Sequence, residues 1–170
     1  MTRIRTARAI QIAAIAATAC LSLAACSGGA GTTTAHHPPA VQPSTGPAAE
    51  AAVKAMWQRF FNGAVPIPDR LKLLQDGTQI APFVRSQEKT TIGAFVLQAS
   101  AKVSSVTLGP AGQASVLFTV FLLNKALAKN LHGTAVYAGG RWLVAVTSFC
   151  SLMLRAYGKT HPAFPAACGG

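Results

Sequence analysis

The sequence predicts an α+β fold in which about three helices precede a curved antiparallel sheet of about four strands and pack on it. Apolar residues at helical spacing are confined to 47–89, whereas β-branched and aromatic residues between glycine turns fill the chain from Ala101 onward. The length of 170 residues leaves room for one such domain beside accessory segments.

The first and longest helix is expected at 47–62. Its apolar side chains recur at helical spacing: Val53, Met56, Trp57 and Phe60. Gly63 follows as a stop signal. Two shorter helices are expected at 68–75 and 78–89, because turn residues separate these segments.

The sheet is expected to be an antiparallel meander. Its predicted strands are 101–108, 113–123, 131–137 and 141–150. The segment 124–130 between the second and third strands is expected to be a loop. The second strand is apolar on both faces near its end, which is typical of a central or curled strand.

Residues 1–25 have the three parts of a secretory signal peptide: a basic start, an apolar run and a junction of small residues. The junction Leu23-Ala24-Ala25-Cys26 resembles the bacterial lipobox, in which the cysteine receives a diacylglyceryl group before the peptide is cut in front of it. Cys20 is a competing position, but Ala17 there lacks the branched side chain of the pattern. An ordinary signal peptide or an uncleaved anchor are the alternatives.

The segment 26–46 is rich in Gly, Thr, Ser and Pro and is expected to be a disordered tether between the lipid and a single domain at 47–170. Two acyl chains on Cys26 would hold the protein on the outer face of the cytoplasmic membrane. His36 and His37 lie in this tether without a further ligand nearby, so no metal site is expected.

The formal net charge of +11 restricts the partners. Three of its cations precede the apolar run, and the others are scattered rather than gathered in a stripe, so nucleic acid is not expected as a partner. Attraction to anionic envelope lipids or polymers fits this charge better.

Cysteine counting predicts one disulfide. If Cys20 leaves with the signal peptide and Cys26 carries lipid, Cys150 and Cys168 remain as a pair in an oxidising compartment. A disulfide closing a loop of this size contributes ~3 kcal/mol in the chain-entropy model. Two free thiols are the alternative.

Several stretches of the domain resemble the mycobacterial low-molecular-weight antigen family of secreted proteins and lipoproteins. The resemblance covers roughly 47–168, and its most specific part is G-x-W-x-V followed by S-F-C and a terminal cysteine. It implies a cone of the nuclear-transport-factor-2-like (cystatin-like) kind, in which three helices close the open side of a bent sheet. That scaffold hosts many activities, so the resemblance leaves the function open.

The sequence contains no recognisable set of catalytic residues, so we expect neither an enzymatic activity nor a cofactor. The four acidic residues all fall on predicted helices or turns, and no phosphate loop or nucleophile motif is present. The expected function is non-enzymatic binding of an uncharged or weakly polar hydrophobic molecule, or of an envelope partner. The candidate pocket lining is Trp57, Phe60, Phe118, Val120, Trp142 and Val144. A structural or interaction module with a filled core and, less favoured, an enzyme of the cone fold are the alternatives.

Overall fold

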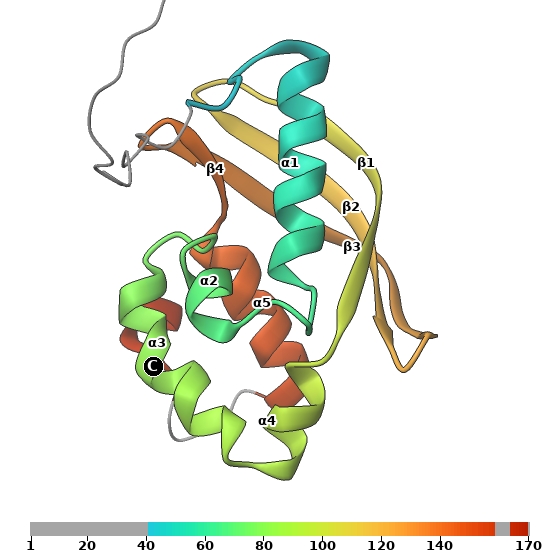
Figure 1. Cartoon of the computed structure of the whole chain (residues 1–170), viewed down its shortest axis with the longest axis vertical. Coiled ribbons are helices and arrows are strands. Elements are labelled where there is room, and N and C mark those ends of the chain that lie inside the picture. Colours follow the sequence, from blue (N-terminus) through green and yellow to red (C-terminus); the bar gives the residue numbers. More distant parts are fainter. Residues whose placement is uncertain (1–40, 159–163, 170) are drawn as a thin grey trace, which may run out of the picture. The chain divides into compact units, whose positions relative to one another are not determined.

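The computed structural model describes residues 41–158 and 164–169. The predicted signal peptide, Cys20, Cys26, His36 and His37 lie outside this part of the chain. Four helices come first, followed by a sheet and a fifth helix (Figure 1). The helices are α1 (Gly46–Phe60), α2 (Ile67–Leu71), α3 (Gly77–Glu88), α4 (Thr91–Val96) and α5 (Val146–Tyr157), with a short 3-10 helix η1 (Ala166–Cys168) near the end.

The sheet is open, antiparallel and four-stranded, in the order β1-β2-β3-β4. Its strands are β1 (Ser100–Leu108), β2 (Gln113–Leu122), β3 (Lys125–Ala138) and β4 (Arg141–Val144). The pairing register shifts in both β1·β2 and β2·β3, and such irregularities bend and twist strands locally. The predicted α+β class with an antiparallel meander is therefore confirmed.

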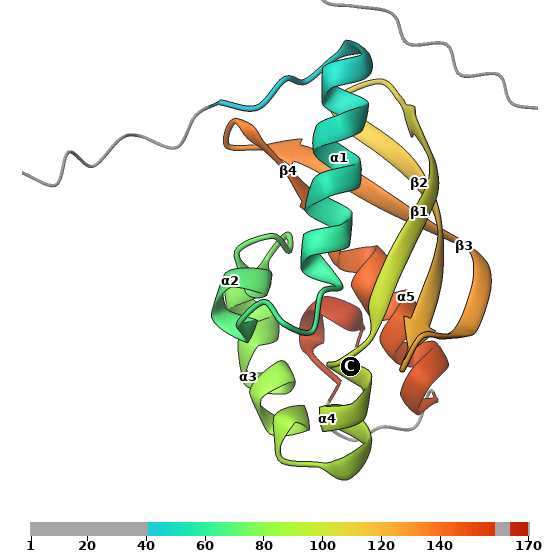
Figure 2. The same ribbon diagram turned by 45° about the vertical axis from the view of Figure 1, so that its right-hand side comes forward.

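Helix α1 crosses one face of the sheet (Figures 1 and 2). Strand β2 turns alternate residues toward this face, where Val116 and Phe118 are fully buried. The Trp57 ring on α1 meets the Phe118 ring edge-on, with 5.1 Å between centroids. It also lies over Gly133, where an added Cβ would sit 2.5 Å from the indole. This half of the inner face is tightly filled.

The folded domain starts before the predicted boundary at Pro47. Gln42 and Pro43, which belong to the predicted tether, bind the turn between β3 and β4. The Gln42 side-chain oxygen accepts a 2.9 Å hydrogen bond from the Trp142 backbone N–H, and the Pro43 carbonyl accepts another of 2.9 Å from the Trp142 indole. Tyr137 also donates its hydroxyl to the Gln42 carbonyl at 2.6 Å.

Two predicted boundaries of the sheet are wrong. The segment 124–130 is not a loop, because β3 already begins at Lys125 and extends the hairpin with β2. The predicted strand 141–150 ends at Val144, and the chain from Val146 forms α5. The reason is helical spacing of the residues that face inward, which outweighs the β propensity of the segment: Val146, Phe149, Cys150, Met153 and Tyr157.

The helix prediction needs a smaller correction. Helices α1 and α3 match 47–62 and 78–89 closely, and α2 is shorter than the predicted 68–75. Helix α4 is additional; the Thr90 hydroxyl caps it by accepting a 2.9 Å hydrogen bond from the Gly93 N–H. None of the helices in the described ranges is long and apolar enough to cross a membrane.

Candidate functional site

A cavity of about 580 Å³ lies between the short helices and one end of the sheet. Figures 1 and 2 show α2, α3, α4 and α5 gathered beyond the C-terminal end of α1. The cavity wall combines side chains from all of these helices with the end of the β2–β3 hairpin. Ligand pockets in proteins are commonly about 300 to 1,000 Å³, so this space has the size of a small-molecule site.

The wall is mostly apolar. Its buried or half-buried members include Phe60, Leu74, Val84, Val120, Leu131 and Phe149. Helix α4 closes one side, and its approach to α3 depends on Gly93, where an added Cβ would lie 2.1 Å from the Gln87 carbonyl oxygen. A glycine at this position therefore lets two short helices meet at the edge of the cavity.

The six residues predicted to line a pocket divide into two groups. Phe60 and Val120 lie on the cavity wall. Trp57, Phe118, Trp142 and Val144 do not line the cavity and are almost completely buried in the packed core. The hollow part of the inner face therefore begins where the side chains of α1 end.

Two buried polar side chains of the wall were not singled out by the sequence. Arg70 on α2 is 9% exposed, and its Nη1 donates a 2.9 Å hydrogen bond to the Leu97 carbonyl. Burial lowers the pKa of Arg70, and the charge of Glu88 opposes this shift. Gln87 on α3 is 5% exposed, and its Oε1 has no hydrogen-bond partner among the described residues.

The charges on the wall are all positive. In the part of the chain that the structure describes, Arg70 and the exposed Arg155 line the cavity and no Asp or Glu does so. Tyr157 is a further polar member, and burial raises the pKa of its phenol. Among the described residues, no group of three or more His, Cys, Asp or Glu side chains is placed to hold a metal ion.

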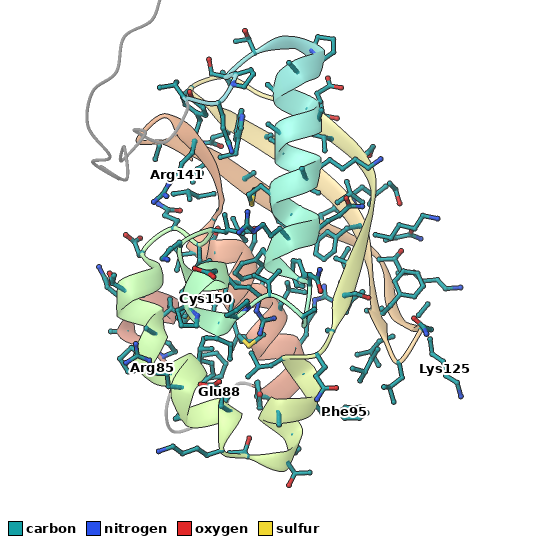
Figure 3. All side chains as sticks on the ribbon, viewed as in Figure 1. Arg85, Glu88, Phe95, Lys125, Arg141 and Cys150 are labelled. Atoms are coloured by element: carbon teal, nitrogen blue, oxygen red, sulfur yellow. A yellow bond between two sulfur atoms is a disulfide. The ribbon has the colours of Figure 1, made fainter. Side chains whose placement is uncertain are left out.

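Two large apolar side chains of the cavity lining are exposed. Phe95 on α4 and Leu127 on β3 line the cavity and are 48% and 66% exposed. Figure 3 shows Phe95 on α4 and Lys125 at the tip of the β2–β3 hairpin. Ile92, Leu123 and Leu154 are other large exposed apolar residues of these helices and of this hairpin. We call Phe95 and Leu127 the apolar rim, because these two also line the cavity.

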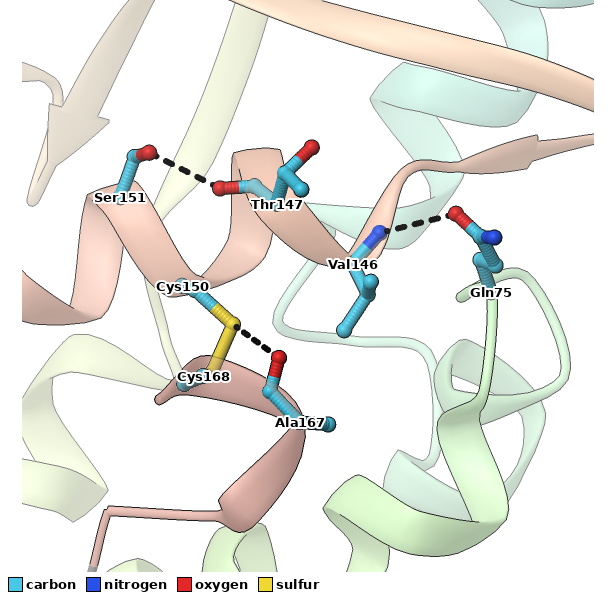
Figure 4. The surroundings of a disulfide bond; sticks show 7 residues. All are labelled: Gln75, Val146, Thr147, Cys150, Ser151, Ala167 and Cys168. Carbon is cyan, nitrogen blue, oxygen red and sulfur yellow. Dashed lines mark hydrogen bonds between the residues drawn. A yellow bond between two sulfur atoms is a disulfide. The ribbon is translucent and has the colours of Figure 1, made fainter. Parts of the chain in front are cut away.

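The Cys150–Cys168 disulfide ties α5 to η1 and matches the pairing expected from the cysteine count (Figure 4). The two Cα atoms are 5.3 Å apart, within the usual range for a disulfide. The Phe83 ring stacks on Phe164 near η1 at a centroid distance of 5.6 Å. The end of the chain is thereby held against the helices that enclose the cavity.

The signals for the missed polar residues were weak in the sequence. Arg70 follows Asp69 in a short polar stretch, which is typical of an exposed turn of helix. Gln87 stands at helical spacing from Ile80, Phe83 and Val84, so the apolar face of α3 could have indicated its burial.

Comparison with known families finds one matching model over residues 46–160, described as the C-terminal domain of the low molecular weight antigen MTB12. Comparisons with curated proteins and with solved structures return no match.

Proposed function

The chain belongs to the low molecular weight antigen MTB12 family, and from this premise we propose that it is an exported, lipid-anchored envelope protein whose domain binds a hydrophobic small molecule without catalysing a reaction. The observation that carries the binding function is the apolar cavity of about 580 Å³ enclosed by α2–α5 and the β2–β3 hairpin. Burial of apolar surface would supply most of the affinity, at ~25 cal/mol per Å².

The proposed scaffold is a cone of the nuclear-transport-factor-2-like kind. The bent meander and the helix packed across its inner face support it. In such a cone, one end can be filled by side chains while the other stays open to a ligand. The division between the packed surroundings of Trp57 and the cavity beyond Phe60 fits this arrangement.

Tryptophan substitution at Val120 tests ligand binding. Val120 lies on the cavity wall, so in the Val120→Trp variant the indole occupies the cavity and blocks uptake of a neutral fluorescent alkyl probe. Ser115→Trp is the matched control, because Ser115 is exposed on the same strand and does not line the cavity. Equal uptake by both variants and the natural protein would refute binding in this cavity.

The proposed anchor rests on the lipobox-like junction at Cys26, which the described residues do not include. Cys26→Ala is expected to leave an unprocessed precursor that takes up no labelled lipid in the producing cell. Unchanged lipid labelling of this variant would show that the anchor lies elsewhere or that another residue carries it.

Docking of an envelope protein is a second candidate function, and the apolar rim favours it. Clustered exposed apolar side chains mark interaction sites more often than scattered ones do. Replacing Phe95 and Leu127 with Ser separates the two functions. Partner docking predicts that this change removes the protein from envelope complexes, whereas binding in the cavity predicts only a modest loss of affinity for the alkyl probe.

A further inference from the structure

We propose that the ligand is a single-chain amphiphile with an anionic head, a carboxylate or a phosphate, and that Arg70 and Gln87 bind this head while the alkyl chain fills the cavity. This inference rests on the proposed function and names its ligand class. It replaces the uncharged or weakly polar ligand expected from the sequence, because that expectation did not include a buried cation on the wall.

Arg70 carries a buried positive charge with no ion-pair partner among the described residues. Its guanidinium is buried yet forms no ion pair within the described ranges, where the one salt bridge joins Lys72 and Asp69 on the exposed side of α2. A guanidinium offers five N–H donors, and the hydrogen bond to the Leu97 carbonyl uses one of them. A buried cation in an apolar wall is stabilised by an anion that approaches its remaining donors.

The charges on the cavity wall also favour an anionic head group. Among the described residues, the ionic side chains of the wall are the buried Arg70 and the exposed Arg155, and no carboxylate lines the cavity with them. Glu88 acts on Arg70 electrostatically, but it lines a neighbouring cavity of about 340 Å³ instead. Arg70 lines both cavities, so it lies at the boundary between the apolar space and this smaller one.

Gln87 supplies the second polar contact. Its amide is buried in the wall, with Nε2 3.3 Å from the Ser86 hydroxyl and Oε1 without a partner among the described residues. A buried polar atom without a hydrogen bond is unfavourable because it has lost its contact with water, so a ligand group that reaches it is stabilised. A half-turn of the amide exchanges its oxygen and its NH₂, which lets Gln87 donate to a carboxylate or phosphate oxygen.

A purely structural role for Arg70 is the alternative. The hydrogen bond to Leu97 joins α2 to the C-terminal end of α4, where a cation is favourable. That role explains the position of the guanidinium but predicts no difference between charged and neutral ligands. A structural role and a ligand-binding role of Arg70 are therefore distinguished by comparing the affinities for charged and neutral ligands, and not by measuring the stability of the variants.

The experiment compares three probes with the same alkyl chain: dodecanoate, monododecyl phosphate and dodecanol. Each is titrated against the full domain by displacement of a neutral fluorescent alkyl probe, below the concentration at which the amphiphiles aggregate. One or both anions are expected to bind about tenfold or more tightly than dodecanol, as expected for hydrogen bonds to a charged group. The stronger of the two anions identifies the head group.

Arg70→Gln is expected to reduce the ratio of anion affinity to dodecanol affinity to about one, and this ratio is the readout even if the variant also binds dodecanol less tightly. Arg70→Lys keeps the positive charge but lacks the planar guanidinium group, so it should retain part of the preference for the anions. Arg85→Gln is the control, since Arg85 is exposed on α3 and lies outside the cavity wall (Figure 3). It should behave like the natural protein.

Equal affinity of the natural protein for all three probes would overturn the inference and leave the proposed function standing, whether or not the Arg70 variants fold. An anion preference that survives in Arg70→Gln, or that is lost in Arg155→Gln instead, would also overturn it. If none of the three probes displaces the fluorescent one, or if that probe itself does not bind, the proposed function fails and the inference fails with it.

Discussion

The two ends of the inner sheet face are built from similar residues but are organised differently. Under α1, the space between helix and sheet is filled, because the Trp57 ring packs against Phe118 and Gly133. Beyond Phe60, the face is covered by short helices that enclose a cavity. A long helix lies against the sheet along its length, whereas several short helices meet at angles and leave space between them.

The two ends are also held together differently. The α1 end is stabilised by close packing and by the hydrogen bonds of Gln42 and Pro43 to the β3–β4 hairpin. The cavity end depends on the Cys150–Cys168 disulfide and on contacts between short helices. This difference indicates that close packing specifies the α1 end, while the other end keeps the space in which we propose that a ligand binds.

The largest expected effect is on the filled end. Trp57→Ala removes a fully buried indole and should lower the free energy of unfolding by about 3–5 kcal/mol, measured by chemical denaturation. Phe95→Ala at the mouth of the cavity is the matched control and should change it by less than about 0.5 kcal/mol. Similar losses in both variants would remove the distinction between the two ends.

Removal of the disulfide addresses the cavity end. Replacing both Cys150 and Cys168 with Ser should lower the free energy of unfolding by about 3 kcal/mol, because an 18-residue separation is then no longer closed in the unfolded chain. Hydrogen exchange should accelerate more in α5 than in β2. Equal acceleration in both elements would contradict a separate role of the disulfide at the cavity end.

A smaller effect is expected from adding one methyl group under α1. Gly133→Ala places a Cβ 2.5 Å from the Trp57 ring, and such overpacking lowers stability by about 1–3 kcal/mol. Gly109→Ala is the control, since its nearest neighbour would be 3.5 Å away, an ordinary contact distance. Thermal unfolding of both variants measures the difference, and an unchanged midpoint for Gly133→Ala would show that this end is not tightly packed.

The filled end was largely predictable from the sequence, and the cavity end was not. Helical spacing gives α1 one apolar side, formed by Val53, Met56, Trp57 and Phe60. The first half of β2 alternates apolar and polar residues, so the two patterns specify which faces meet. Helix α4 has only six residues, which is too short for a periodic pattern to stand out. Helix α5 was hidden because Val146–Cys150 continues the β-branched and aromatic composition of β4.

The residues of the candidate site were also only partly predictable from the sequence. Phe60 and Val120 could be assigned to the inner face from periodicity, but periodicity does not distinguish a filled face from a hollow one. Arg70 could not be predicted as a wall residue, because its burial depends on how α2 meets the end of α4, 27 residues away in the sequence. Such tertiary contacts are decided by packing between segments distant in sequence.

We expect the cavity end, and not the filled end, to take up an alkyl chain. Methyl NMR of the domain during titration with dodecanol tests it directly, because both ends carry methyl groups. Shifts are expected at the wall residues Val120, Leu131 and Met153, with Val53 and Val116 in the packed core nearly unchanged. No shift at saturating dodecanol, or shifts of equal size in the core, would contradict it.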